Sequence, residues 1–221
     1  MNVWVVIPAY NEAGSLEGII QELKKRNLFV LVIDDGSGDT TFKVAQKAAD
    51  RVIQNTHNLG KGRSLKEAIA QLLQKSDFDY IITMDGDGQH SPFDVDNFLK
   101  EATRGQYFVV GNRMQNPVGM PRLRVFTNQL MSWFISKMIG QKIPDTQCGF
   151  RLIKRDVLEN IKITTSKFEI ESEILLQAAK RGFAITSIPI QSIYFQGVHS
   201  NINPFIDTLR FIRFIFQLKS G

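Results

Sequence analysis

The sequence of 221 residues has a single cysteine, Cys148, and it contains no internal repeats or low-complexity segments. One cysteine excludes an internal disulfide framework and is typical of a reducing compartment. No catalytic set of residues accompanies this cysteine, so we interpret Cys148 as a packed thiol. The content of 43% hydrophobic and 22% charged residues is ordinary for a globular protein, and disorder is therefore not expected.

The apolar tail also lacks a run of apolar residues long enough to cross a membrane. Residues 204–218 are about fifteen in number and include Arg210 and Arg213, whereas a span needs about 20 apolar residues. The tail fits an amphipathic helix in a membrane interface, and equally a helix that packs on the domain. The N-terminus enters a strand pattern at once, which leaves no room for a signal peptide. We therefore expect a cytoplasmic protein, peripheral on the inner face of the cell membrane.

Basic residues outnumber acidic ones. The sequence has 27 Lys and Arg against 22 Asp and Glu, a formal net charge of +5, and its isoelectric point is near 9.3. This balance favours anionic partners, which include nucleic acid, phosphorylated small molecules and an acidic membrane surface. Charge alone does not choose among them.

Apolar runs alternate with helical patterns through the first half of the chain. This alternation predicts an α/β fold with a mostly parallel central sheet covered by helices on both faces. Beyond residue 113 the alternation weakens, and the helix expected at 125–139 is rich in large apolar side chains, which fit either a core or a lipid-facing surface. The expected strands are 3–7, 29–33, 52–53, 80–84, 108–110 and 184–190; the expected helices include 16–23, a helix capped by Asp39 or Thr40, 65–72, and one that carries Glu171 and Glu173 and ends at Gly182.

Polar loops follow three of the predicted strands, after Ile7, after Ile33 and after Met84. In open α/β sheets, ligands bind outside the carboxyl ends of the strands. Because a random polar turn has no reason to recur at the same edge, we expect these loops to form one site. Asp35 in the second loop is a candidate to accept hydrogen bonds from a base or ribose.

The third loop has the strongest chemical signal. Asp85, Asp87 and Gln89 alternate with Gly86 and Gly88 at the end of an apolar strand, so their side chains can share one face. Oxygen ligands of this kind suit Mg²⁺ or Mn²⁺, and such an ion would attract a diphosphate. Taken alone, the same residues also fit a polar turn after a strand. The spacing does not fit an EF-hand calcium loop.

The motifs together resemble the family 2 glycosyltransferases of the GT-A fold, which has a Rossmann-like sheet. The resemblance is closer to the branch of polyprenyl (dolichyl) phosphate sugar synthases. The matching motifs run in the family's order over nearly the whole chain. They are residues 6–12 (ending in Pro-Ala-Tyr-Asn-Glu), 33–37 (Ile-Asp-Asp-Gly-Ser), 58–62, 85–90 (Asp-Gly-Asp-Gly-Gln-His), 111–113, Asp145 with 149–151, and Glu173 with 188–190.

The resemblance implies a donor site for a nucleotide diphosphate sugar of the GDP-mannose or UDP-glucose type. It implies a divalent ion, Mg²⁺ or Mn²⁺, held by Asp85, Asp87 and Gln89, and an arginine, Arg113, that approaches the phosphates. Transfer of the hexosyl group would then proceed with inversion. The implied nucleotide-sugar-binding residues are Pro8, Tyr10, Glu12, Ile33, Asp35, Lys61, Asp85, Gly86, Asp87 and Arg113; Asp87, Arg113 and Asp145 are the implied catalytic residues.

The resemblance leaves two acceptors open. A polyprenyl phosphate is already ionised at neutral pH and needs no strong general base. A sugar hydroxyl in a cell-wall or surface polysaccharide would instead lose its proton to a carboxylate such as Asp145. Relatives commonly carry an Arg and a Ser-Lys pair near residues 194–201, which this chain replaces with residues that include His199. The candidate acceptor-binding residues are Arg122, Arg124, Arg151, Glu173, His199 and Ser200.

We expect one domain over residues 1–221. Its nucleotide-sugar half is 1–113, its acceptor half is 114–203, and residues 204–221 form an amphipathic C-terminal helix. A nucleotidyltransferase is disfavoured because the first strand is not followed by a glycine-rich triphosphate loop. A nucleic-acid partner is not expected, because paired carboxylates in the cleft do not suit it.

Overall fold

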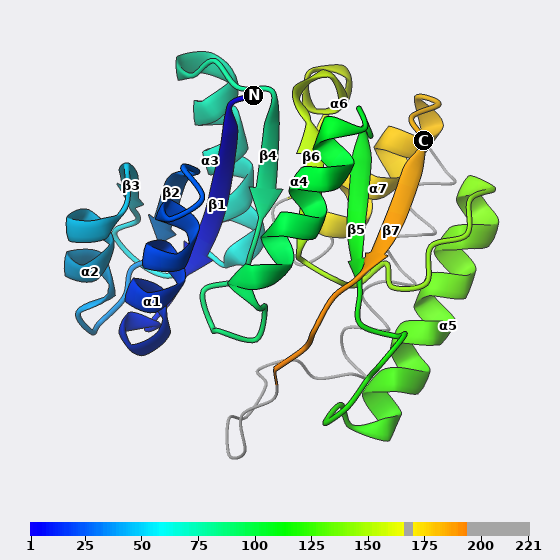
Figure 1. Ribbon diagram of the computed structural model, residues 1–221, viewed down its shortest axis with the longest axis horizontal. Helices are drawn as coiled ribbons and strands as arrows, with labels where there is room; N and C mark the ends of the chain where they lie inside the picture. The colour runs from blue at the N-terminus through cyan, green and yellow to red at the C-terminus, as the bar shows by residue number, and fades with distance from the viewer. Residues whose placement is uncertain (166–169, 194–221) are drawn as a thin grey trace.

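The computed structural model describes residues 1–165 and 170–193. Its seven-stranded sheet has the strand order β3-β2-β1-β4-β6-β5-β7 (Figure 1). All pairs are parallel except those of β6, which runs antiparallel to β4 and β5. The strands are β1 (Val3–Ala9), β2 (Phe29–Asp34), β3 (Arg51–Gln54), β4 (Tyr80–Thr83), β5 (Phe108–Asn112), β6 (Arg151–Lys154) and β7 (Ile185–Pro189).

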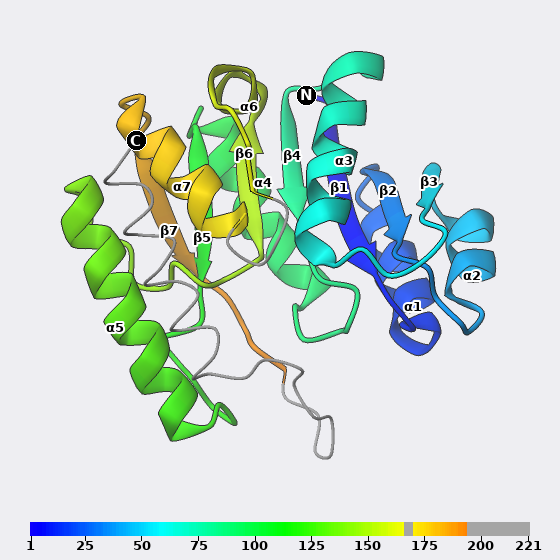
Figure 2. The same ribbon diagram turned by 180° about the vertical axis from the view of Figure 1, so that it is seen from behind.

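Helices cover both faces of this sheet. In Figures 1 and 2, α1 and α4 lie on one face, and α3 and α7 lie on the opposite face. The prediction of a mostly parallel sheet between helical layers is therefore confirmed. The helices are α1 (Ala13–Lys24), α2 (Thr41–Ala48), α3 (Lys61–Lys75), α4 (Val95–Thr103), α5 (Arg122–Ile139), α6 (Arg155–Asn160) and α7 (Ile170–Lys180), with a 3₁₀ turn η1 (Pro92–Asp94).

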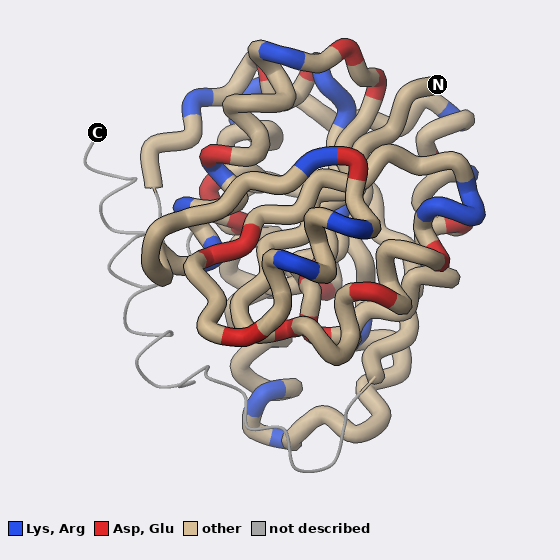
Figure 3. The backbone as a smooth tube through the Cα atoms, turned by 90° about the vertical axis from the view of Figure 1, so that its left-hand side faces the viewer, with Lys and Arg blue, Asp and Glu red and all other residues tan. Residues whose placement is uncertain are grey.

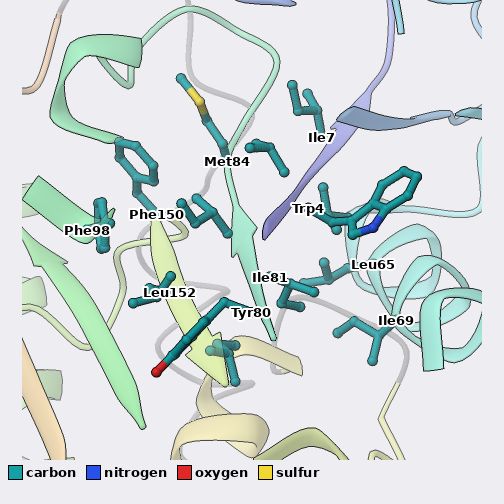
Figure 4. Packing of buried hydrophobic residues seen from close by; sticks show 14 of the residues in the cluster. Trp4, Ile7, Leu65, Ile69, Tyr80, Ile81, Met84, Phe98, Phe150 and Leu152 are labelled. Atoms are coloured by element: carbon teal, nitrogen blue, oxygen red, sulfur yellow. The ribbon is translucent and has the colours of Figure 1, made fainter. Parts of the chain in front are cut away.

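The core lies between the sheet and these helices. Every residue of β4 is buried, as expected for a central strand covered on both faces. Figure 4 shows Leu65 and Ile69 pointing from α3 toward the part of the sheet that carries Ile81. The helical spacing of these apolar residues is what lets α3 bury one face against the sheet.

Helix α5 departs from this pattern. It packs against α7 at the outer edge of the sheet, and it buries Asn128, Ser132 and Ile135. The core interpretation of this apolar segment holds for one side of the helix only, where Ile135 is buried and Met131 and Ile139 pack against the core, while many of its large apolar side chains are exposed. The exposed side chains are Leu123, Phe126, Leu130, Trp133, Phe134 and Met138. Among the described residues, none of the helices combines the length and the apolar character that crossing a membrane requires.

Charged residues are distributed broadly. Figure 3 shows Lys and Arg interspersed with Asp and Glu over one side of the molecule. The excess of five positive charges is therefore not gathered into one basic face in that view.

Candidate active site

Four parallel strands, β1, β2, β4 and β5, bring their carboxyl ends to one edge of the sheet. Their loops are held together there by short contacts. The Asp35 N–H donates to Ala9 O at 2.9 Å, and the Ser15 hydroxyl donates to Gly86 O at 2.6 Å. A Cβ at Gly86 would lie 3.3 Å from Ala9 Cβ, so the third loop packs closely on the end of β1. The predicted convergence of three polar loops is therefore confirmed.

The first two loops are tied to each other. Asn11 N–H donates to Ser37 Oγ, and Gly38 N–H donates to Asn11 Oδ1, both at 2.9 Å. Glu12 N–H donates to Thr41 Oγ1 at 2.8 Å. These bonds fix the segment that follows β1 against the segment that precedes α2.

Three predicted nucleoside contacts lie in very different environments at this edge. The Tyr10 side chain is 45% exposed beside the loops, and Pro8 is half-buried at the end of β1. Ile33 is fully buried in the core within β2, so its side chain is not available to a ligand. A contact between Ile33 and a ligand would therefore have to involve its backbone.

The carboxylate of Asp35 holds the turn in front of α3. Its Oδ1 accepts hydrogen bonds from Asn55 Nδ2, Leu59 N–H and Ser64 Oγ, and its Oδ2 accepts one from Gly60 N–H at 2.8 Å. Burial would raise the pKa of Asp35, but these hydrogen bonds more than offset it and lower the pKa. The sequence predicts that Asp35 accepts hydrogen bonds from a base or ribose. In the structure its Oδ1 already accepts three hydrogen bonds from the protein, which that prediction did not include.

An ion-paired cluster follows β4. Lys61 Nζ lies 2.6 Å from Asp85 Oδ1 and 2.8 Å from Glu171 Oε1. Burial alone would lower the pKa of Lys61, but the two carboxylates raise it above its usual value. Burial would likewise raise the pKa of Asp85, and the Lys61 ammonium brings it below its usual range. Both groups are therefore charged at neutral pH.

Asp87 lies in a more repulsive environment. Burial, together with the neighbouring Asp85 carboxylate, raises its pKa. Burial and then the carboxylates of Asp87, Asp39 and Asp85 raise the pKa of Glu12 to about 7. The Oδ1 of Asp87 accepts a hydrogen bond from Gln89 N–H at 2.9 Å. A cation beside Asp87 would relieve this repulsion.

The donor set fits a divalent ion that shares its coordination with a substrate. In residues 1–165 and 170–193, no group of three or more His, Cys, Asp or Glu side chains is arranged to hold a metal ion by itself. Asp85 and Asp87 offer carboxylate oxygens, and Gln89 offers an amide oxygen. Magnesium is usually held by one or two carboxylates together with substrate phosphates, and this set supplies that kind of partial cage.

His90 is a buried residue that packs beneath the loop containing Asp85 and Asp87. Its side chain is 3% exposed, its ring stacks on Phe150 at a centroid distance of 5.1 Å, and its Nδ1 accepts a hydrogen bond from Asp85 N–H. Burial lowers the pKa of His90. A neutral His90 protonated on Nε2 therefore orients the backbone of Asp85.

Arg113 and Asp145 form a buried bidentate pair. Arg113 Nε donates to Asp145 Oδ2 at 2.7 Å, Arg113 Nη2 donates to Asp145 Oδ1 at 3.0 Å, and the Arg113 backbone N–H also donates to Oδ2. Asp145 is fully buried and Arg113 is 6% exposed. The structure thus brings these two predicted catalytic residues together, with the carboxylate of Asp145 directed at Arg113.

Two residues that were predicted to bind the acceptor, Arg151 and Glu173, have structural roles instead. Arg151 is 1% exposed, and its guanidinium donates to the backbone carbonyls of Thr146, Cys148 and Glu171. Glu173 is also 1% exposed, and its carboxylate accepts hydrogen bonds from the backbone and hydroxyl groups of Thr164 and Thr165. The assignment of both residues to acceptor binding is corrected, because their charged groups are buried and hydrogen-bonded to the protein itself.

The remaining acceptor candidates lie elsewhere. Arg122 and Arg124 open α5, where Arg122 is exposed and Arg124 is half-buried. His199 and Ser200, and the helix expected at 204–221, lie outside the described residues.

Sequence reasoning did not single out Glu171, His90 or Gly149 as site residues. A Cβ at Gly149 would lie 2.8 Å from both Lys61 Nζ and Glu171 Oε1. The motifs around these residues were visible, but the contacts join segments far apart in the chain. No local spacing signals such a contact.

Comparison with known proteins gives a family for this arrangement. The model of the family described as "Glycosyl transferase family 2" matches residues 4–162. The chain is 30% identical to "Glycosyltransferase AglJ" of Haloferax volcanii, over 93% of this chain and 68% of that protein. It is 26% identical to "UDP-N-acetylglucosamine--dolichyl-phosphate N-acetylglucosaminyltransferase" of Methanococcus voltae, over 87% and 86% of the two chains.

Comparison with solved structures gives the fold. The crystal structure of mannosyl-3-phosphoglycerate synthase from Rubrobacter xylanophilus matches with a TM-score of 0.73 and 19% identity, over all of this chain and 75% of that one. The predicted GT-A fold is therefore confirmed.

Proposed function

The chain belongs to glycosyl transferase family 2, and we propose that it moves a hexosyl group from a nucleotide diphosphate sugar to a polyprenyl phosphate with inversion at the anomeric carbon. The donor is of the GDP-mannose or UDP-glucose type. A relative from Methanococcus voltae is named for a UDP-sugar and a dolichyl phosphate, which supports both substrate classes.

Residues 1–113 form the donor half in this proposal. Tyr10, Asp35 and Pro8 would contact the nucleoside, and Lys61 and Arg113 would contact the diphosphate. Gly86 lets the third loop approach the end of β1, since a side chain there would crowd Ala9. Arg113 reaches the phosphates from its pair with Asp145, so Asp145 acts as a positioning residue.

Asp85, Asp87 and Gln89 would hold Mg²⁺ or Mn²⁺ together with the donor phosphates. Such an ion supplies charge neutralisation for the leaving diphosphate and a template for its orientation. Glu12, whose pKa is raised to about 7 by its burial and three neighbouring carboxylates, lies on the same side.

The state of Asp145 is the observation that favours a phosphate acceptor. A hydroxyl acceptor needs a carboxylate that can take its proton. Asp145 is fully buried, and both of its oxygens accept hydrogen bonds from Arg113. A phosphate acceptor needs no such base because its oxygen is already ionised. This arrangement supports a lipid phosphate.

In the proposed reaction, an ionised oxygen of the polyprenyl phosphate attacks the anomeric carbon. The new bond joins that carbon to the phosphate oxygen, and the bond from the carbon to the donor diphosphate breaks. The nucleoside diphosphate leaves with the electron pair of that bond, opposite the attacking oxygen. Arg113 and Lys61 stabilise the negative charge that develops on it.

Residues 114–203 form the acceptor half, and α5 supplies its lipid-facing surface. We define this surface by Leu123, Phe126, Leu130, Trp133, Phe134 and Met138, which are 39–64% exposed. Helix α5 begins near the edge where the strands end, as Figure 1 shows, so Arg122 and Arg124 lie at the site end of the apolar surface. In this proposal the enzyme is peripheral on the cytoplasmic face of the membrane.

The proposal is tested by a product assay with Mg²⁺ or Mn²⁺. A short polyprenyl phosphate is offered with GDP-mannose, UDP-glucose and UDP-N-acetylglucosamine in turn, beside the matching polyprenol as a hydroxyl acceptor. Sugar on the lipid phosphate, lost in Asp87→Asn but kept in the exposed control Asp77→Asn, is the expected result. Transfer to polyprenol alone would overturn the proposal in favour of a hydroxyl acceptor.

The membrane surface has its own test. Wild-type protein is expected to sediment with anionic liposomes, and the double variant Trp133→Ser with Phe134→Ser is expected to remain largely in the supernatant. The control is Phe29→Ser, which changes an exposed aromatic at the opposite end of the sheet. Equal sedimentation of both variants would contradict the role of α5.

A further inference from the structure

Lys61 connects the two halves of the proposed enzyme. Its ammonium lies between Asp85, which follows β4 in the donor half, and Glu171, which lies in the first turn of α7 in the acceptor half. The two distances, 2.6 and 2.8 Å, are nearly equal, so the lysine is shared rather than committed to one partner. The side chains of Lys61 and Asp85 are each 28% exposed, and that of Glu171 is 16% exposed.

The position of Lys61 is fixed from its own backbone. Lys61 is the first residue of α3, and the preceding residues, Leu59 and Gly60, donate their N–H groups to the Asp35 carboxylate. Gly60 has a φ of +90°, which suits glycine at this turn. The base of the lysine side chain is thus held by hydrogen bonds that do not involve Asp85 or Glu171.

The far end of Lys61 is confined as well. Gly149 faces the ion-pair bridge that Lys61 forms between Asp85 and Glu171. A Cβ at this position would lie 2.8 Å from both Lys61 Nζ and Glu171 Oε1 and 3.3 Å from Asp85 Oδ2. The Gly149 carbonyl accepts a hydrogen bond from the Thr83 hydroxyl at 2.6 Å, which anchors the backbone there. The three charged groups therefore meet in a space that glycine leaves open.

A single partner would create a conflict at Asp85. If Lys61 could pair only with Asp85, a divalent ion that took this carboxylate would leave a partly buried ammonium without a counter-ion, at a cost in free energy. Glu171 removes the conflict, because the ammonium keeps one carboxylate when the other changes partner.

We propose that Lys61 is a displaceable counter-ion for Asp85 and that Glu171 is the positioning residue that retains it when a divalent cation and a nucleoside diphosphate bind. The inference rests on the proposed function of this site. It makes α7, in the acceptor half, a determinant of cation affinity in the donor half. The retained ammonium then stays beside the place where the donor diphosphate lies.

The test measures binding of Mn²⁺ alone to the nucleotide-free full-length protein, from the loss of the free-ion electron paramagnetic resonance signal at low, fixed ionic strength. Glu171→Gln is expected to weaken Mn²⁺ binding about two- to fivefold, the range that a partly exposed ion pair supports. Lys61→Met is expected to tighten it by a similar factor. Glu171→Gln added to Lys61→Met is expected to have no further effect, because Glu171 acts through the lysine.

The control is Glu12→Gln, which removes another carboxylate near Asp87. Its effect on Mn²⁺ affinity is expected to be the same in wild type and in Lys61→Met. Circular dichroism checks that each variant is folded. The inference is overturned if Glu171→Gln weakens Mn²⁺ binding equally in the presence and absence of Lys61, since that result means a simple charge effect, or if it has no effect in wild type.

Asp87→Asn separates this inference from the proposed function. If Asp87→Asn abolishes both Mn²⁺ binding and sugar transfer while the Glu171 and Lys61 effects are additive, only the positioning role fails. If sugar transfer survives in Asp87→Asn, the proposed site itself fails.

Discussion

Glu12→Gln is expected to stabilise the ion-free protein at alkaline pH. Glu12 is half-buried at the end of the first loop, where burial and then the carboxylates of Asp87, Asp39 and Asp85 raise its pKa from 4.5 to about 7. The raised pKa means that the folded state disfavours the ionised form of Glu12. Replacing it with a neutral side chain of similar shape removes that penalty.

The sign of the effect follows from proton linkage. Between pH 4.5 and about 7, the folded state binds more protons at Glu12 than the unfolded state, so stability falls as pH rises through this window. Below pH 4.5 the carboxyl is protonated in both states. Above pH 7 it is ionised in both states, and the full penalty is present.

The magnitude is set by the shift and by solvent. A rise in the pKa of Glu12 from 4.5 to about 7 corresponds to about 3 kcal/mol in the absence of screening. Because Glu12 is only half-buried, solvent screening reduces this to about 1 kcal/mol. For a protein of this size, that is a change of about 2–4 °C in Tm.

The measurement is calorimetric Tm from pH 4.5 to 8 in the presence of EDTA. Glu12→Gln is expected to melt about 2–4 °C above wild type at pH 8 and level with it at pH 4.5. Glu17→Gln, at an exposed position on α1, is the control. A Tm gain that is the same at both pH values, or a loss at pH 8, would refute the carboxylate repulsion at this site.

Three further outcomes are expected. Arg151→Met leaves three buried carbonyls without their donor and is expected to cost about 3 kcal/mol in urea unfolding; a cost under about 1 kcal/mol would contradict its role as a structural tie. Burial raises the pKa of Cys148 to about 12, so its thiol is expected to resist a disulfide reagent at pH 8 until urea is added, and rapid native labelling would contradict this. Gly149→Ala is expected to change Tm by less than about 4 °C but to reduce transfer at least about tenfold, because its methyl group separates Lys61 from Glu171; undiminished transfer would count against the bridge.

The fold was largely predictable because the strands and helices of its first half are marked by local patterns of apolar residues. Strands such as β1 and β4 are continuous apolar runs, and α1 and α3 have clear helical spacing. The antiparallel strand β6 was not predicted. It has only four residues, begins with Arg151 and ends with Lys154, and its place between β4 and β5 depends on pairing with distant segments.

The candidate site was predictable to the extent that it depends on loop chemistry. Asp85 and Asp87 stand together in the sequence and in the structure. The burial of Arg151 and Glu173 was not predictable, because a charged side chain can be buried only when the fold supplies partners, and those partners come from other loops. The same reason hid the sharing of Lys61 between Asp85 and Glu171.

The composition of helix α5 does not predict which of its faces is buried. Its many large apolar residues fit a core helix and a lipid-facing helix equally well in the sequence. Only the folded structure shows that small and polar groups such as Asn128 and Ser132 are buried, with Ser132 bonded to Thr146, while Trp133 and Phe134 remain exposed.

The most direct test of the proposed function is a comparison of two acceptors that differ by one group. Polyprenyl phosphate and polyprenol of the same chain length are incubated with the full-length protein, the preferred nucleotide sugar and Mg²⁺ or Mn²⁺, and the lipid products are identified by mass spectrometry. We expect one hexose on the phosphate, of inverted anomeric configuration, none on the alcohol, and loss of the product with EDTA or Asp87→Asn. Transfer to the alcohol alone, or transfer to the phosphate that persists in Asp87→Asn, would contradict the proposed function.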